Sequence, residues 1–251
     1  MATGEVATQI TLRHLETLSE LRGAVELQQE IWGFSDIELL PLRLFVVAQK
    51  VGGQVIGAFD GERMIGFLLA IPGLKHGEIY LHSHMMGVQA PYRNLGVGRM
   101  LKLAQRDQAL ARNIKLVEWT FDPLEIKNAY FNIERLGAVV RRYVLNQYGT
   151  TTSHLHGGLP TDRCVAEWYL DSDRVLANLA GQRNPYVGIV ERVAVPNDIA
   201  ELRQNEPGRA REMQSGVSDA FLAHFQRRLA VTGFERSAGA GIYLFSQWPS
   251  N

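Results

Sequence analysis

The chain has 251 residues, 46% of them hydrophobic, which is enough for one large domain or for a domain with a smaller appendage. Its 26 basic and 26 acidic residues cancel, so no strong overall field attracts nucleic acid or an anionic membrane. A single cysteine, Cys164, offers no internal disulfide, and we expect a reducing environment.

The sequence also argues against a membrane or secreted protein. No hydrophobic run approaches the roughly 18 residues of a membrane span. The first ten residues, MATGEVATQI, lack the basic and hydrophobic regions of a secretory signal. We therefore expect a soluble cytoplasmic protein that binds neither nucleic acid nor a membrane.

In chain order, the first part of the sequence alternates between strand and helix patterns. A short strand is predicted from Gln9, a helix over Ser19–Trp32 capped by Ser19, and a helix over Leu39–Val51. Three strands follow, QVIGAFD, RMIGFLLAI and EIYLHSHMMGV, with a hairpin turn at Asp60-Gly61 between the first two. The next helix begins near Gly98.

The remaining elements continue this α/β alternation. We predict a strand IKLVEWTF from Ile114, a helix LEIKNAYFNIERLGA closed by Gly137, and the strands VVRRYVLNQY and RCVAEWYL. Beyond Asp171 the pattern predicts one strand over 186–195, a helix over about 207–230 and a terminal hairpin over 233–248. We interpret residues 1–171 as the main domain and residues 172–251 as a small α/β extension packed on it.

The stretch APYRNLGVGRMLKLAQRDQ places Gly96 and Gly98 at a helix start, with Arg93 and Arg99 on either side. Bare backbone N–H groups, a helix N-terminus and positive charge together predict an anion site. The P-loop string is absent, and a dinucleotide fingerprint needs a glycine where Leu101 stands. The alternative is that the glycines only form a turn between strand and helix.

The string VQAPYRNLGVGRML contains R-x-x-G-x-G and, with AYFNIERLGAV, resembles the GCN5-related N-acetyltransferase (GNAT) superfamily over about residues 10–148. The resemblance implies a mixed, mostly antiparallel twisted sheet with a splayed central strand pair, flanked by helices. It also implies acetyl-CoA or another acyl-CoA as the donor. More narrowly, LHSHMMGVQAPYRNLGVGRMLK and WTFDPL are similar to a group of predicted GNAT acyltransferases with a C-terminal extension.

The resemblance also assigns roles to individual residues. The pyrophosphate would lie on the loop and first helical turn, held by Arg93, Asn94, Gly96, Val97, Gly98 and Arg99. Backbone groups of Met86 and Val88 would contact the pantetheine, and the Val88 N–H would polarise the thioester carbonyl.

The later helix departs from the family pattern. Ile133 occupies the place of the tyrosine that usually protonates the departing thiolate. Asn128 and Asn132 share a helix face that could meet the cofactor, so Asn128 is a candidate cofactor contact. Tyr130 and Tyr143 are substitutes for the acid only if the geometry allows.

Candidate bases lie on two strands. Strict alternation predicts His82, His84 and Met86 on one face and Ser83 on the other, while Glu118 lies on the next strand. Our catalytic candidates are therefore His84 and Glu118, together with the Val88 N–H. The alternative is that the histidines are hydrogen-bonded core residues and that Glu118 pairs with an arginine.

Two H-x-H pairs raise a metal site as an alternative. His82 and His84 form one pair and His154 and His156 the other, with Asp122 as a further oxygen donor. No spacing fixes a third ligand, so we expect no metal, and a metal hydrolase is the least favoured function.

Together these features predict an N-acyltransferase that moves an acyl group, acetyl by default, directly from acyl-CoA to the amine of a small molecule such as an amino acid. A succinyl donor stays open because Arg141, Arg142 and Arg163 could meet a carboxylate. The alternative is a non-catalytic acyl-CoA-binding regulatory module, and the sequence leaves a homodimer open.

Overall fold

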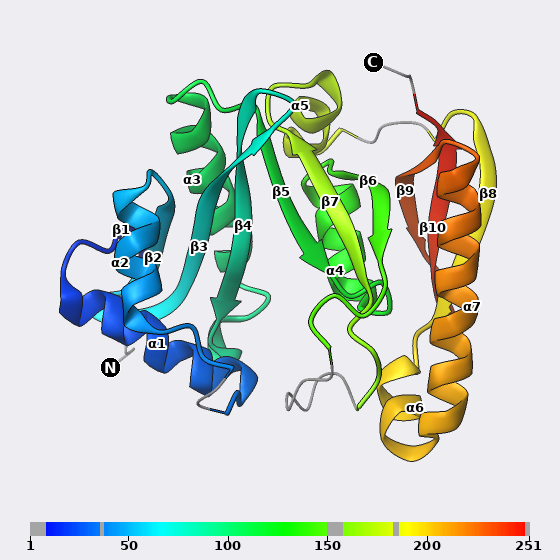
Figure 1. Ribbon diagram of the computed structural model, residues 1–251, viewed down its shortest axis with the longest axis horizontal. Coiled ribbons are helices and arrows are strands. Elements are labelled where there is room, and N and C mark those ends of the chain that lie inside the picture. The colour runs from blue at the N-terminus through cyan, green and yellow to red at the C-terminus, as the bar shows by residue number, and fades with distance from the viewer. Residues whose placement is uncertain (1–8, 36–37, 150–157, 183–185, 249–251) are drawn as a thin grey trace, which may run out of the picture. The chain divides into compact units, whose positions relative to one another are not determined.

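The computed structural model describes residues 9–35, 38–149, 158–182 and 186–248 (Figure 1). The chain forms two compact units, Met1–Ile114 (unit 1) and Lys115–Asn251 (unit 2). The predicted division at residue 171 stays a prediction. Each unit is a sheet with helices, so the mixed α/β class is confirmed.

Unit 1 contains four antiparallel strands in the order β1-β2-β3-β4. Their bounds are Ile10–His14, Gln54–Asp60, Arg63–Lys75 and Glu78–Val88. The helices α1 (Leu18–Trp32) and α2 (Leu42–Lys50) pack on one face of this sheet, and α3 (Val97–Leu110) packs on the other (Figure 1). The predicted Asp60-Gly61 turn joins β2 to β3, as expected.

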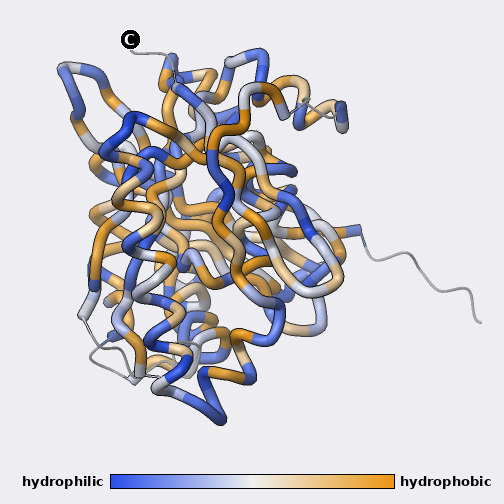
Figure 2. Tube along the Cα trace, turned by 90° about the vertical axis from the view of Figure 1, so that its right-hand side faces the viewer, coloured by the Kyte–Doolittle hydropathy of each residue, from blue (hydrophilic) through white to orange (hydrophobic). Residues whose placement is uncertain are grey.

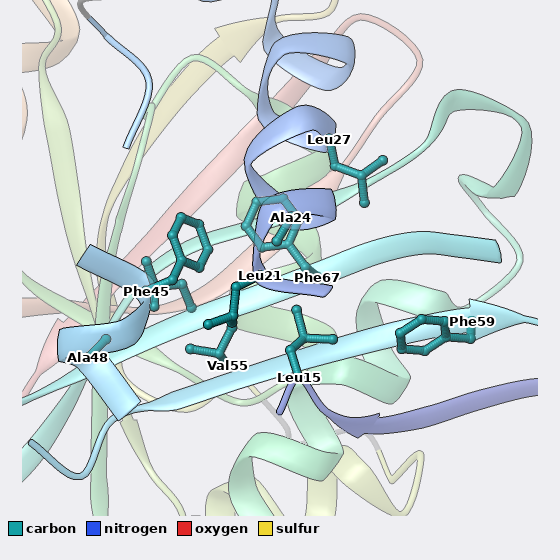
Figure 3. Packing of buried hydrophobic residues seen from close by; sticks show 10 residues of the cluster. Leu15, Leu21, Ala24, Leu27, Phe45, Ala48, Val55, Phe59 and Phe67 are labelled. Atoms are coloured by element: carbon teal, nitrogen blue, oxygen red, sulfur yellow. The ribbon is translucent and has the colours of Figure 1, made fainter. Parts of the chain in front are cut away.

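The core of unit 1 lies between α1, α2 and the sheet (Figure 3). Leu21 and Ala24 from α1 and Phe45 from α2 meet Val55 and Phe67 of the strands, and all five are buried. Strand β2 and the central residues 65–70 of β3 are buried on both faces, which explains their nearly continuous hydrophobic sequence. The predicted cap at Ser19 is wrong.

Thr17 caps α1 instead. Its side chain accepts the Glu20 N–H at 3.2 Å, and the Glu20 carboxylate accepts the Thr17 N–H at 3.0 Å. This reciprocal capping box satisfies two backbone donors at the helix start. Ser19 lies inside the first turn because the helix begins at Leu18.

The described part of unit 2 contains six strands in the order β5-β7-β6-β9-β10-β8, and neighbouring strands in it are antiparallel. Their bounds in chain order are Leu116–Phe121 (β5), Val139–Val144 (β6), Arg163–Tyr169 (β7), Ile189–Pro196 (β8), Leu229–Arg236 (β9) and Ala240–Gln247 (β10). The helices are α4 (Ile126–Tyr130), α5 (Asp173–Leu179), α6 (Ile199–Asn205) and α7 (Pro207–Gln226). The C-terminal strands thus continue the sheet of unit 2 through β6 and β9.

The helix predicted over residues 124–138 is only partly α-helical. After α4 the chain forms η2 (Phe131–Arg135), a π-helical turn in which the Leu136 N–H donates to the Phe131 carbonyl. Gly137 ends the turn with a φ of 80°, as its predicted role requires. The π turn adds one residue per turn, so α-helical spacing from Gly137 does not apply to the residues before it.

The C-terminal segment is organised around Phe221 of α7. Its ring packs edge-on against Tyr243 at 4.9 Å and Phe245 at 5.1 Å, measured between ring centroids. The helices α5 and α6 were not predicted, because seven residues are too few to show a helical period. The part of the chain that the structure describes has no helix long and apolar enough to cross a membrane, and hydrophobic and hydrophilic residues interleave along it (Figure 2).

Candidate active site

The predicted phosphate-binding loop joins β4 to α3 in unit 1. A short turn, η1 (Ala90–Tyr92), precedes it, and Gly96 is the N-cap of α3. No described side chain caps this helix, so the N–H groups of its first turn, at Val97 and Gly98, lack the partner that a capping side chain supplies. Together with the positive end of the helix dipole, these N–H groups form a geometry suited to an anion.

The two glycines of the loop have different explanations. Gly96 has a φ of 84°, a left-handed conformation that favours glycine, and Asn94 has a φ of 66°. At Gly98 an added Cβ would meet only the Met86 Cε atom, at an ordinary 3.6 Å. The protein's own packing therefore does not require glycine at position 98. A ligand lying directly on the backbone would require it.

Arg93 bends back onto the end of β4. Its Nε donates to the Val88 carbonyl oxygen at 3.1 Å, while the residue stays exposed. The guanidinium is thus tied to the strand that precedes the loop. This contact fixes a positive charge at the end of β4.

The hydrogen-bond pattern of β4 fixes the direction of its backbone groups. The Gln89 N–H donates to the Ile65 carbonyl at 2.9 Å, and Val88 lies opposite Gly66. Val88 and Gly66 are therefore a non-hydrogen-bonded antiparallel pair, in which the N–H and C=O of Val88 point away from β3. Two residues earlier, Met86 lies opposite Leu68 in the same arrangement. The backbone groups predicted to contact the pantetheine thus face the edge of β4 away from β3.

A β-bulge at His84 changes the predicted alternation of side chains. Ser83 lies opposite Ala70 and Met85 opposite Leu69, so His84 is an extra residue on β4. Ser83 contacts Lys102 of α3, and Met86 reaches Gly98 of the same helix. Met86 therefore shares the α3 face with Ser83, and the prediction that it shares a face with His82 is wrong.

The imidazoles of His82 and His84 remain close to each other. Their ring centroids are 6.0 Å apart, and both residues are half-buried. Burial lowers the pKa of His84, which favours the neutral imidazole. A neutral imidazole is the form that can accept a proton at neutral pH.

The C-terminal end of α1 covers the end of β4, which sequence reasoning missed. A Cβ at Gly87 would lie 2.7 Å from Trp32 and 2.8 Å from Ile31, so only glycine lets this helix approach the strand. The buried Gln89 donates through Nε2 to both Glu30 oxygens, at 2.9 and 2.8 Å. A glycine followed two residues later by glutamine, at the end of a strand, is too weak a signal to identify in sequence.

In unit 2, Glu118 on β5 forms the ion pair that the sequence left open. Its carboxylate lies 2.7 Å from the Arg142 guanidinium, and its side chain is 4% exposed. Arg142 also contacts Glu167 at 3.1 Å. Burial alone would lower the pKa of Arg142, but its hydrogen bond to Glu118 and the two carboxylate charges raise it. An ion pair stabilises the carboxylate anion, which makes it a weaker proton acceptor.

The possible substitutes for the family tyrosine also lie in unit 2. Ile133 is fully buried, and the Tyr143 hydroxyl lies 2.9 Å from Ser218 Oγ and 3.3 Å from the Asp162 carboxylate. Burial raises the pKa of Tyr143, and Tyr130 lies under the Arg236 guanidinium. Asn128 is exposed on α4.

The three arginines proposed to meet a succinyl carboxylate already have partners. Arg141 pairs with Glu167 and donates to the Tyr169 hydroxyl at 2.6 Å. Arg142 pairs as described, and Arg163 is buried and donates to the Asp162 carbonyl at 3.1 Å. A longer acyl carboxylate would have to compete with these contacts.

Asp122, a possible metal ligand in the sequence, accepts from Arg203 of α6 at 2.7 Å. Of the other histidines considered, His154 and His156 lie outside the described residues. Within the described ranges, no group of three or more His, Cys, Asp or Glu residues is arranged to hold a metal ion.

Comparison with known proteins identifies the fold. Neither a protein-family model nor a curated protein sequence matches the chain. Among solved structures, the ribosomal-protein-S18-alanine N-acetyltransferase from Escherichia coli matches with a TM-score of 0.51 and 19% identity, over 65% of this chain and 96% of that one. Arabidopsis thaliana NAA60 in complex with acetyl-CoA matches with a TM-score of 0.54 and 15% identity, over 65% and 100%.

A structure of the NatC complex bound to Gag peptide and CoA also matches, with a TM-score of 0.51 and 13% identity over 64% of this chain and 98% of that one. The chain has the GNAT fold. Each match leaves about a third of the chain uncovered, because the neighbours are shorter.

Proposed function

We propose that the protein is an acyl-CoA-dependent N-acyltransferase that acts on the amine of a small molecule by direct transfer. The observation that carries this proposal is the orientation of β4. The backbone groups of Met86 and Val88 point away from β3, and the strand leads directly into an uncapped helix N-terminus. A strand edge followed by an anion site matches a long ligand with a peptide-like arm and a diphosphate.

In this proposal the diphosphate of CoA lies on the amides of Asn94, Gly96, Val97, Gly98 and Arg99, with Arg93 beside them. The pantetheine arm pairs with β4 at Met86 and Val88. Asn128, on α4 of unit 2, stays a candidate cofactor contact. The Val88 N–H donates to the thioester oxygen as negative charge develops there, the type of stabilisation that often dominates acyl transfer. Acetyl-CoA is the default donor.

The acceptor must lose a proton before it attacks. For a lysine-type ammonium this costs about 4–5 kcal/mol at pH 7, whereas an α-amino group needs only about 1 kcal/mol. We propose His84 as the base, because its lowered pKa keeps the imidazole neutral. Glu118 is the second candidate, although its ion pair with Arg142 weakens it as a base. The thiol that leaves titrates near 8.5, so a dedicated acid is not essential.

One observation favours the alternative of a non-catalytic acyl-CoA-binding module. Ile133 is buried and has no ionisable group, and the Tyr143 hydroxyl, a possible substitute for the acid, is tied to Ser218 and Asp162. A module of this kind would bind acyl-CoA and would not release CoA.

Thiol release from acetyl-CoA, measured with a panel of amino acids and other small amines, separates the two functions. If the protein is an enzyme, we expect release with at least one acceptor. We expect no release from Gly98→Asp, because the added carboxylate would occupy the site and repel the diphosphate. Binding of desulfo-CoA without release for any acceptor supports the module. Absence of both binding and release contradicts both functions. Cytoplasmic location and a homodimer stay predictions.

A further inference from the structure

Lys102 is a buried lysine that the proposed chemistry does not use. It lies on α3, and 2% of the residue is exposed. Its Nζ donates to Ser83 Oγ of β4 at 2.9 Å and to Gln105 Oε1 at 3.0 Å. The network continues to β2, because the Gln105 amide donates to Gln54 at 3.3 Å and Gln54 Nε2 donates to the Gln105 carbonyl at 3.1 Å.

Stability alone does not account for a lysine in this position. Burial of an ammonium group costs several kcal/mol, and apolar residues of similar volume commonly replace buried charged groups without loss of stability. Burial places the pKa of Lys102 well below its ordinary value. A role other than stabilising the fold would account for a lysine at this position.

The position of the network connects two parts of the candidate site. Lys102 lies one helical turn after Gly98, on the helix whose N-terminus forms the proposed diphosphate site. Ser83 directly precedes His84, the extra residue of the β4 bulge. The Lys102–Ser83 hydrogen bond therefore joins α3 to β4 next to the bulge, where β4 departs from regular pairing with β3.

We propose that Lys102 is a positioning residue that holds Ser83 against α3 and thereby fixes the bulge that orients His84. The proposal rests on the proposed function only for its effect on turnover, since the orientation of His84 is a property of the protein alone. A bulge inserts an unpaired residue and re-aims its side chain, and it persists when neighbouring contacts support it. Lys102 supplies such a contact from α3, which packs on this face of the sheet.

The test replaces Lys102 by methionine, which has a similar length and no hydrogen bond. Leu101→Met is the matched control, a conservative change at a buried position on the same helix. The His84 imidazole is followed by NMR titration, the midpoint of thermal unfolding by calorimetry, and desulfo-CoA affinity by titration calorimetry. Acyl transfer is measured in parallel.

We expect Lys102→Met to unfold at the same temperature or higher, and its His84 pKa to rise by about half a unit as the bulge relaxes toward solvent. We also expect kcat to fall about tenfold, with desulfo-CoA affinity within twofold of the original. Leu101→Met should leave the His84 titration unchanged. A His84 titration in Lys102→Met that coincides with the original overturns the proposal.

Ser83→Ala removes the same bond from the other side and decides the question if Lys102→Met does not fold. An unchanged His84 titration in Ser83→Ala also overturns the proposal, and a matching shift supports it. Failure of the proposed function is recognised separately, by absence of desulfo-CoA binding or of turnover in the original protein. The His84 titration remains interpretable in that case.

Discussion

The Nε atom of Arg93 donates to the carbonyl oxygen of Val88 across 3.1 Å, which joins the loop arginine to the last residue of β4. The Val88 carbonyl points away from β3, so Arg93 marks the same strand edge that the proposed donor uses. One side chain thus connects the proposed diphosphate site with the proposed oxyanion donor.

Replacement of Arg93 by alanine should weaken desulfo-CoA binding about tenfold, because a charge-assisted contact and the tether to Val88 are both lost. Arg112→Ala is a suitable control, since Arg112 lies just beyond the far end of α3 and donates to the Gly52 carbonyl. Titration calorimetry at two salt concentrations measures both effects. Equal affinity for the two variants would contradict the role given to Arg93.

Gly98→Ala and Gly96→Ala should change the stability of the protein in opposite directions. At Gly98 a Cβ has room and helix propensity favours alanine, so the free energy of unfolding should rise by at most about 1 kcal/mol. The affinity for desulfo-CoA should fall more than about tenfold. At Gly96 the φ of 84° penalises alanine by about 1–2 kcal/mol. Denaturant unfolding and calorimetry on both variants check this. Full affinity in Gly98→Ala would show that no ligand lies against its α-carbon.

Thr17→Ala should destabilise the protein by about 1 kcal/mol through loss of the helix cap, and Ser19→Ala by less than about 0.5 kcal/mol. Denaturant unfolding separates the two positions. A larger loss for Ser19→Ala than for Thr17→Ala would show that the helix begins elsewhere.

The capping box should also make stability depend on pH. The Thr17 N–H, and next the Arg13 guanidinium, lower the pKa of Glu20 from 4.5 to about 2. The unfolded chain therefore binds this proton at a higher pH than the folded chain, so the stabilisation is complete above pH 4.5 and is lost as the pH falls toward 2. Glu20→Gln should show a shallower decline over this interval in acid unfolding. Identical pH profiles would contradict the assignment.

Arg203→Met should cost about 3–5 kcal/mol, since it leaves Asp122 buried without its guanidinium. The double variant Arg203→Met with Asp122→Leu should recover much of this loss in thermal unfolding.

A chain that ends at residue 171 should fail to fold stably. It lacks Arg203 and Tyr243, which both contact the turn after β5. Tyr243 does so by a hydrogen bond to the Pro123 carbonyl at 2.6 Å. Circular dichroism and thermal unfolding test this prediction.

Hydrophobic periodicity and glycine placement predicted the first strands, the hairpin and the start of α3, because these features are local. Strand β4 was predicted with its observed bounds, yet the faces of its side chains were not, since the extra residue at His84 shifts the register with β3 and interrupts the alternation. The π turn at Phe131 and the cap at Thr17 are not visible in hydrophobic periodicity either, although the capping box itself is a local pattern, Thr17-x-x-Glu20.

For the candidate site, the loop glycines could be recognised from sequence because their spacing is a motif. The Glu118–Arg142 pair could only be left open, since residues 24 positions apart become neighbours through the pairing of β5, β7 and β6. A lysine on a helix is usually expected to face solvent, and only the packing of α3 on β4 shows that Lys102 is buried. The sequence thus indicates the class of ligand more readily than it indicates which side chains pair around the candidate site.

The most direct test of the central claim is a titration of isotopically labelled protein with desulfo-CoA, followed through the backbone amide resonances. The account predicts saturable shifts concentrated at Met86, Val88, Gly96, Val97 and Gly98, which disappear in Gly98→Asp. Absence of shifts at these amides, or shifts confined to another part of the chain, would contradict it.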